Sequence, residues 1–218
     1  MAKKVAVVLS GCGVFDGAEI YEATLVQLRL DEAGVEFQCM APNIDQMHVI
    51  NHITGEEMPE KRNVLVESAR LCRGNIIDLA TANPDDYAAV IFPGGFGAAK
   101  NLCNFAVKGA DMDVNPDVVT FVQGMHAQKK PIGLICIAPA MAPKLFGTGV
   151  KCTVGDNADP AADAVRAMGG DHQGCSVDKF TIDEDFNLLT TPAYMLAGRI
   201  SEASAGITEL VKAVIARM

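Results

Sequence analysis

Short, continuous runs of apolar residues alternate along the chain with longer segments whose apolar positions recur at helical spacing. The clearest runs lie at 5–9, 86–92 and 131–135, and each ends in a turn that carries glycine or cysteine. A continuous apolar run is typical of a parallel strand covered by helices on both faces. The alternation therefore predicts an α/β fold with a flavodoxin-like, doubly wound and mainly parallel sheet.

The remaining elements follow from periodicity and from residues that begin or end helices. Asp16, with Glu19 three positions on, forms a capping-box-like start for a first helix that ends at Gly34. No linker or change in composition divides the chain, so we expect one domain over 1–218 with an inserted segment at about 42–78. Further helices are expected at about 62–70, 98–107, 116–128, 138–146, 159–168 and 197–218, and further strands at 34–41, 151–154, 180–183 and 188–191.

Cys136 falls on the turn between a buried strand and the next predicted helix, which has Pro139 in its first turn. A nucleophile at such a turn stands above the carboxyl end of the sheet, the arrangement known as a nucleophile elbow. The helix N-terminus should favour the thiolate of Cys136 over its thiol, so we expect a lowered pKa. On this stretch alone, a buried and unreactive cysteine is the alternative.

Two further segments could complete a site at this edge of the sheet. Glu19 and Glu22 lie three apart on one helix face, and if Glu19 caps the helix, Glu22 is free for chemistry. Gly94 and Gly95 follow another buried strand, where backbone N–H groups can face a small anionic atom as in an oxyanion hole. A tight structural turn is the alternative there, and polar residues of the insert either wall a pocket or face solvent.

Composition excludes several classes of function. The formal charge of −9 argues against nucleic acid or an anionic membrane as a partner, because both require a basic face. Seven cysteines without a Cys-x-x-Cys pair indicate neither a disulfide framework nor a structural zinc site, and a reducing cytoplasm fits best. Gly11 and Gly13 lack the third glycine of a dinucleotide-binding loop. The first apolar run is too short for a signal peptide or membrane span.

Three motifs resemble landmarks of the ThiJ/PfpI, class I glutamine amidotransferase-like superfamily: Gly17-Ala-Glu-Ile-Tyr-Glu22, Phe92-Pro-Gly-Gly-Phe-Gly97 with Asn101 just beyond it, and Ile135-Cys-Ile-Ala-Pro139. Four others, Leu9–Glu19, Val49–Glu56, Arg62–Leu65 and Thr190–Met195, are similar to its ElbB branch of isoprenoid biosynthesis proteins with an amidotransferase-like domain.

The resemblance implies a cofactor-free, glutathione-independent glyoxalase that converts glyoxal to glycolate, with a deglycase activity on glycated amines and thiols. It assigns Cys136 as nucleophile and Glu22 as its acidic partner, and it implies no metal. Oxyanion or substrate binding falls to Gly94, Gly95, Ile137 and Asn101, with His52 and Arg62 as candidates from the insert. It also implies a homodimer, for which the 50% hydrophobic composition is an independent reason. The candidate surfaces are 48–62 and the stripe Ile20, Ala23, Thr24, Gln27 and Leu28.

The chain departs from other members of the superfamily at two positions. Amidotransferases need a late His followed two residues on by an acidic residue, whereas His172 is followed by Gln173 and Gly174, so glutaminase activity is improbable. Peptidase-like relatives place His directly after the nucleophile, where this chain has Ile137. A redox-sensing or stress-protective protein without catalysis, or a binding protein with a vestigial site, therefore remains an alternative to the glyoxalase.

Overall fold

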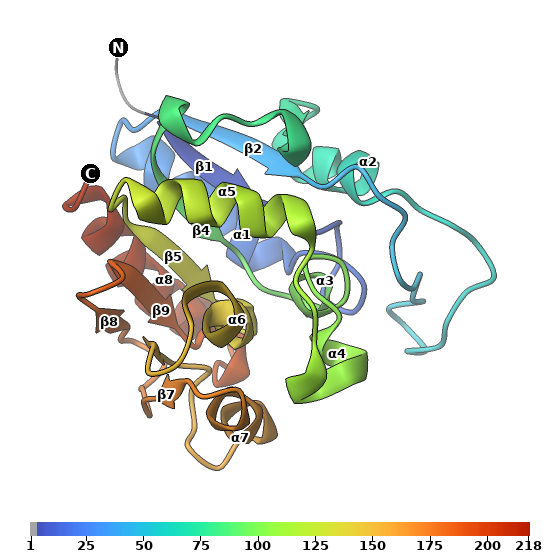
Figure 1. Ribbon diagram of the computed structural model, residues 1–218. Coiled ribbons are helices and arrows are strands. Elements are labelled where there is room, and N and C mark those ends of the chain that lie inside the picture. Colours follow the sequence, from blue (N-terminus) through green and yellow to red (C-terminus); the bar gives the residue numbers. More distant parts are fainter. Residues whose placement is uncertain (1–3) are drawn as a thin grey trace.

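A seven-stranded sheet with the strand order β3-β2-β1-β4-β5-β9-β8 forms the centre of the computed structural model, which describes residues 4–218 (Figure 1). Every neighbouring pair is parallel except β8 and β9, which form an antiparallel pair at one edge. The expected flavodoxin-like α/β fold is confirmed. The strands are β1 (Lys4–Val8), β2 (Phe37–Ala41), β3 (Ile76–Asp78), β4 (Tyr87–Phe92), β5 (Ile132–Ile135), β8 (Thr181–Asp183) and β9 (Leu188–Thr191), while β6 (Lys151–Cys152) and β7 (Asp171–His172) form a separate small sheet.

Successive side chains of the central strands pack into two different hydrophobic cores, one on each face of the sheet. In β1, Ala6 and Val8 contact one hydrophobic cluster, and Val5 and Val7 contact the other. This separation follows from the two-residue period of a strand, which points successive side chains to opposite faces. Since both faces are covered, the strand needs no polar positions, and its apolar run in the sequence is explained.

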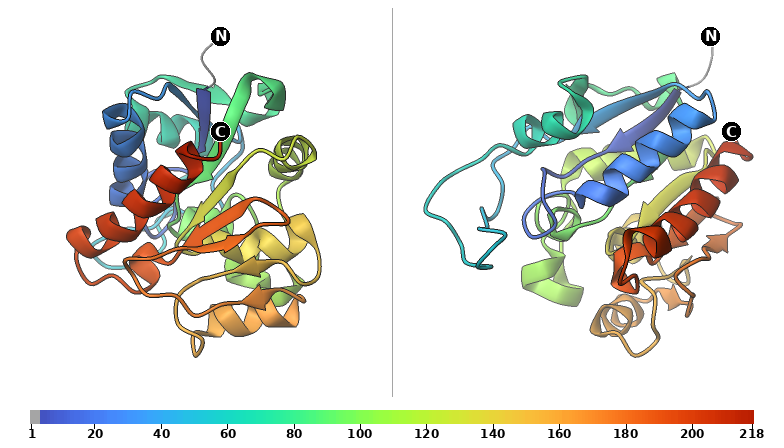
Figure 2. Two further views of the ribbon diagram at one scale, coloured as in Figure 1. Left: turned by 90° about the vertical axis from the view of Figure 1, so that its left-hand side faces the viewer. Right: turned by 180° about the vertical axis from the view of Figure 1, so that it is seen from behind.

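Helices cover the two faces of the sheet as separate layers (Figure 2). One face carries α1, α2 and α8, and α1 packs beside α8 although the two are far apart in sequence. The other face carries α3, α5 and α6. The helices are α1 (Ile20–Glu32), α2 (Val64–Ser68), α3 (Phe96–Lys100), α4 (Phe105–Lys108), α5 (Pro116–Ala127), α6 (Ala142–Phe146), α7 (Pro160–Ala167) and α8 (Ile200–Ile215).

The start of α1 differs from the sequence expectation. Glu19, rather than Asp16, is the N-cap, and its Oε2 accepts a hydrogen bond from the Glu22 N–H at 2.7 Å. Asp16 instead accepts from the Ile50 N–H at 2.7 Å and so holds the insert against the first loop. The expected apolar surface stripe on α1 is also interrupted, because Ala23 is fully buried in the core.

The segment after Cys136 does not begin as an α-helix. Residues Ala138–Met141 form a 3₁₀ helix, and the α-helical turns of α6 begin only at Ala142. Pro139 and Pro143 both lack an N–H, so neither can donate the hydrogen bond that would continue a regular helix through this stretch. The helix that the sequence places at 98–107 is likewise divided, into α3 and α4.

The inserted segment leaves the body of the molecule after β2 and returns through α2 to β3 at the edge of the sheet (Figures 1 and 2). Neither β3 nor β7 was expected from the sequence, because runs of three and two residues carry too little periodicity. Within residues 4–218, no helix is long and apolar enough to cross a membrane.

Candidate functional site

Cys136 directly follows β5, and its backbone is in the left-handed region with φ +63°. A non-glycine residue in this region is uncommon and strained, and it persists only where the surroundings fix it. Here the Cys136 N–H donates to the Thr191 carbonyl at the end of β9 at 2.9 Å. The expected nucleophile-elbow geometry is therefore present at the carboxyl end of the sheet.

The loop after β4 approaches this cysteine so closely that only glycine fits. A Cβ on Gly94 would collide with the Cys136 Cβ and would lie 2.9 Å from Glu22 Oε2. Gly95 has φ +92°, and a Cβ there would collide with the backbone of residues 17–19. These two glycines let three chain segments meet around one sulfur atom.

Glu22 is completely buried beside Cys136. Its Oε2 accepts from the Gly94 N–H at 2.8 Å, and its Oε1 accepts from the Tyr194 N–H at 3.3 Å. Burial, with a smaller contribution from the charge of Glu19, raises the pKa of Glu22 to about 7. The carboxyl group can therefore gain and lose a proton near neutral pH, as a general acid or base must.

The thiol of Cys136 has a raised pKa, and the expectation of a lowered one is wrong. Burial is the main cause, and the adjacent Glu22 carboxylate adds to it because a second negative charge there is disfavoured. Hydrogen bonds from the Gly95 and Ile137 N–H groups to the sulfur lower the pKa of the thiol, but by less than burial and Glu22 raise it. The short 3₁₀ start of the following helix offers little of the stabilisation that a long α-helix would give.

A cavity of about 300 Å³ opens onto Cys136. Glu19 reaches it, whereas Glu22 is not among the residues that line it. The sequence analysis gave Glu19 a capping role alone. Its position at the start of a helix, next to the carboxyl edge of the sheet, was the signal that its side chain could also face a pocket. The full lining is Val14, Glu19, Gly95, Phe96, Ala99, Phe105, Ala106, Cys136, Ile137, Asp159, Ala161, Tyr194 and Met195.

Two residues expected to bind an oxyanion or substrate have other partners. The N–H of Gly94 is committed to Glu22. Asn101 is buried and donates to the carbonyls of Ser10 and Asp16 at 2.8 and 2.9 Å, while its Oδ1 accepts from the Met47 N–H at 3.0 Å. Asn101 therefore ties loops together, and the N–H groups of Gly95 and Ile137 are left facing the sulfur.

The insert candidates do not line the Cys136 cavity. His52 stacks on Phe15, with ring centroids 4.9 Å apart, and its Nε2 accepts from the Phe15 N–H at 3.2 Å. Arg62 pairs with Glu60 at 2.6 Å and lies 3.7 Å from Glu67. His52 thus ties the insert to the first loop, Arg62 forms ion pairs within the insert, and neither residue is among those that line the Cys136 cavity.

Comparison with known proteins gives the relationship of this chain. It is 45% identical to the ES1 protein homolog, mitochondrial, of Rattus norvegicus, over 97% of this chain and 83% of that protein. It superposes on the crystal structure of an isoprenoid biosynthesis protein with amidotransferase-like domain from Ehrlichia chaffeensis with a TM-score of 0.92, 35% identity and 99% of each chain covered. The chain belongs to the ElbB-like family. No protein-family profile matches it.

More distant structures share the fold of this ElbB-like chain. Glyoxalase III from Candida albicans superposes with a TM-score of 0.62 and 13% identity, over 100% of this chain and 98% of that one. At that identity the likeness establishes the fold alone. The activity has to be argued from the residues around Cys136.

The ElbB-like chain offers Cys136 no histidine from among the residues that line its cavity. His172 lies in β7, where its Nε2 accepts from the Val154 N–H at 3.1 Å and its Nδ1 is 3.1 Å from Asn157 Oδ1. Both ring nitrogens are thus engaged in holding the small sheet. A Cys-His-acid triad of the amidotransferase kind is not assembled within the described residues.

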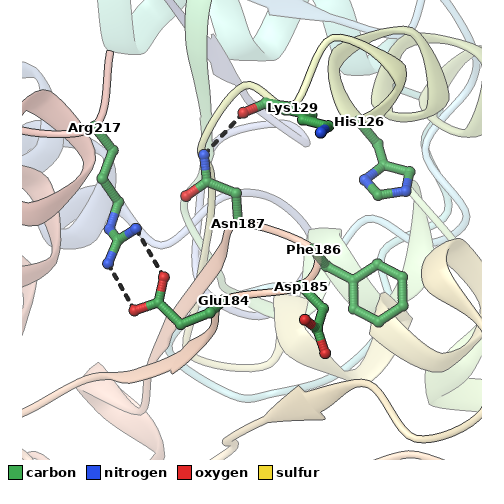
Figure 3. Close-up of a pocket in the computed structure, with 7 residues that line it drawn as sticks. All are labelled: His126, Lys129, Glu184, Asp185, Phe186, Asn187 and Arg217. Atoms are coloured by element: carbon green, nitrogen blue, oxygen red, sulfur yellow. Dashed lines mark hydrogen bonds and ion pairs between the residues drawn. The ribbon is translucent and has the colours of Figure 1, made fainter.

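A second, larger cleft lies at the amino ends of β5 and β9 in this ElbB-like protein (Figure 3). It measures about 590 Å³, and His126 is among the residues that line it. Arg217 donates to both oxygens of Glu184 at 3.0 and 2.9 Å, and Asn187 donates to the Lys129 carbonyl at 2.9 Å. His126 therefore lies at the opposite end of the sheet from Cys136.

No group of three or more His, Cys, Asp or Glu side chains in residues 4–218 is arranged to hold a metal ion.

Proposed function

We propose that this protein is a cofactor-free, glutathione-independent glyoxalase that converts glyoxal and water to glycolate. The observation that carries the proposal is the pairing of a strained, cavity-facing Cys136 with the buried carboxyl group of Glu22, whose pKa of about 7 suits proton transfer. The same first step, addition of sulfur to a carbonyl carbon, would also serve a deglycase.

The raised pKa of Cys136 sets the first step. The thiol, rather than a preformed thiolate, meets the substrate, and the Glu22 carboxylate takes its proton as sulfur bonds to one aldehyde carbon. The electrons of that carbonyl move onto its oxygen. The N–H groups of Gly95 and Ile137 face the sulfur, next to the carbon with which it bonds, and they are therefore the donors that we propose for this oxygen.

The second step moves a proton between the two carbons. Protonated Glu22 first neutralises the alkoxide to give a hemithioacetal, and its carboxylate then removes the C–H proton to form an enediolate. Return of that proton to the second carbon, with passage of the hydroxyl proton to the second oxygen, leaves a thioester of glycolate. Water hydrolyses the thioester, which releases glycolate and restores the Cys136 thiol.

A direct product assay tests the proposal. Purified protein is incubated with ¹³C-labelled glyoxal without glutathione, and glycolate is followed by NMR. We expect glycolate from the wild type and from Cys175→Ser, which alters a half-buried thiol absent from the cavity lining. Absence of glycolate from wild-type protein over its whole stable pH range would refute the proposal.

A redox-sensing role for Cys136 has weaker support. Oxidation of cysteine requires thiolate character and exposure. Cys136 is 7% exposed, and its thiol has a raised pKa.

The use of cysteine fits a reducing compartment such as the cytoplasm, since all seven cysteines are free thiols.

We also propose that the protein forms a homodimer through the insert and α1. Several large apolar side chains are exposed there, among them Ile53 at 95%, with Ile20, Leu28 and Met58 each exposed by more than a third. Large apolar side chains left exposed to this degree are typical of interaction surfaces. Sedimentation at low micromolar concentration should give a species of twice 23.0 kDa, which Ile53→Asp shifts toward the monomer. A monomeric wild type would refute this arrangement.

A further inference from the structure

The cavity above Cys136 is much larger than glyoxal requires. A volume of about 300 Å³ corresponds to roughly ten water molecules at about 30 Å³ each. Glyoxal has only four heavy atoms and would leave more than half of this space empty. A substrate that fills the cavity must therefore carry a further group beside its dicarbonyl unit.

The walls that would receive this group are mainly apolar. They come from elements widely separated in sequence, since α3 and α4 form one part and the segments around Ile137, Ala161 and Met195 form others. Burial of an apolar group against such walls is favourable in proportion to the area removed from water. The apolar lining residues are Val14, Phe96, Ala99, Phe105, Ala106, Ile137, Ala161 and Met195.

The charged groups at the cavity are all acidic. Glu19 is 7% exposed and Asp159 is half-buried, and both line the space, whereas no lysine, arginine or histidine is among its lining residues. Lys100 lies over the Phe96 ring, 5.4 Å from its centroid, but its ammonium donates to the Phe15 carbonyl and Lys100 does not line the cavity. A substrate with a carboxylate or phosphate would find no cationic partner here and would meet like charge.

We propose that the substrate is an α-oxoaldehyde whose second carbonyl carries an uncharged, branched or aromatic group of about four to six carbons. This inference rests on the proposed function and specifies the substrate class of the same site. Cys136 adds to the aldehyde carbon, the former aldehyde C–H proton moves to the ketone carbon, and water hydrolyses the resulting thioester. The product is the corresponding 2-hydroxy acid, and no external oxidant or reductant is consumed.

Three substrates test the class with the wild-type protein. Glyoxal is the small reference compound. The second substrate, 5-methyl-2-oxohexanal, adds a branched alkyl group. The third, 4,5-dioxopentanoate, has a carboxylate at the position of the terminal methyl groups of 5-methyl-2-oxohexanal. Each buried methylene is worth on the order of fourfold in specificity, so kcat/KM for the branched aldehyde should exceed that for glyoxal by roughly 10- to 100-fold. The carboxylate analogue should fall below the branched aldehyde by a similar factor.

The outcomes separate this inference from the proposed function. If none of the three compounds is turned over, the glyoxalase proposal itself fails. Turnover of glyoxal with an equal or lower kcat/KM for the branched aldehyde overturns the substrate class and leaves the glyoxalase intact. Preference for the carboxylate analogue would overturn the electrostatic part of the inference.

A pair of substitutions on α4 shows whether the cavity sets the preference. Ala106 lines the cavity and is solvent-accessible, so Ala106→Phe should narrow it with little effect on folding. The ratio of kcat/KM for branched aldehyde to that for glyoxal should fall at least fivefold. Val107→Phe adds bulk to the next residue, which is 65% exposed and outside the lining, and should leave the ratio unchanged. Equal ratios in both variants and the wild type would contradict the assignment of the apolar walls.

Discussion

The cleft at the amino ends of β5 and β9 has about twice the volume of the cavity at their carboxyl ends, yet the two differ more in chemistry than in size. In the amino-end cleft, Arg217 and Glu184 form a two-bond ion pair at the surface. Behind the carboxyl-end cavity, Glu22 is fully buried beside Cys136 and has no cationic partner among its hydrogen bonds. Burial without a cationic partner disfavours the charged carboxylate, and the pKa of Glu22 is accordingly raised to about 7.

Backbone conformation separates the two regions in the same way. Lys129 and Asn187 at the amino-end cleft also have positive φ, but they occupy a helix end and a hairpin turn, where this conformation is ordinary. Cys136 has it directly after a buried parallel strand. Backbone strain combined with a titratable neighbour, rather than volume, is therefore the basis for our proposal that the carboxyl-end cavity is the reactive one.

The largest effect expected is from removal of the nucleophile. Cys136→Ala should lower kcat/KM for glyoxal by at least about 10⁴-fold, because covalent catalysis is lost entirely. Arg217→Gln in the other cleft should change it by less than about twofold and cost at most about 1 kcal/mol in stability. Comparable losses in the two variants would mean that the wrong cavity has been identified as the active one.

Glu22→Gln should change the reactivity of the Cys136 thiol and the rate of turnover in opposite directions. The loss of a proton carrier should lower kcat/KM by about 10² to 10⁴. Alkylation of Cys136 by iodoacetamide should nevertheless become faster, since the neighbouring negative charge that raises its pKa is gone. Glu184→Gln is the matched change in the amino-end cleft and should alter neither rate. If alkylation and turnover of Glu22→Gln both fell, damage to the fold would explain the loss.

Stability should depend on pH through Glu22. Its pKa is raised from 4.5 to about 7 in the folded protein, so the folded state holds a proton that the unfolded state releases between these values. The associated stabilisation is complete below about pH 4.5 and is lost as pH rises through about 7. It amounts to about 3 kcal/mol. Urea unfolding at pH 5 and pH 8 should show a drop in wild type that is largely absent from Glu22→Gln and preserved in Glu184→Gln.

The smallest effect expected is from Glu19→Gln. The rise of kcat/KM with pH should follow ionisation of Glu22, and its midpoint should move to lower pH because the charge of Glu19 helps to raise the pKa of Glu22. The plateau rate should fall less than about tenfold, since Gln can still accept the capping hydrogen bond. A pH–rate profile measures both quantities. An unmoved midpoint would show that the two carboxyl groups act independently.

Local sequence was sufficient for the fold and for the position of Cys136 at a strand-to-helix turn. The apolar run over 5–9 and the position of Cys136 after a buried strand both follow from periodicity and chain order. The direction of the Cys136 pKa shift could not be predicted, because it depends on burial by segments remote in sequence. The same holds for the Gly94 N–H, whose partner Glu22 is 72 residues away, and for Glu19, whose access to the cavity depends on how α1 meets the sheet.

The Tyr194 N–H reaches Glu22 across 172 residues of sequence, and this contact has a consequence for biosynthesis. A chain that emerges from the ribosome N-terminus first carries Glu22, Gly94 and Cys136 long before Tyr194 and α8 are available. Until that last segment docks, Glu22 lacks one of its two backbone donors and the cavity at Cys136 lacks the wall that Tyr194 forms. The surroundings of the proposed catalytic pair, Cys136 and Glu22, are therefore completed only when synthesis of the chain is nearly finished.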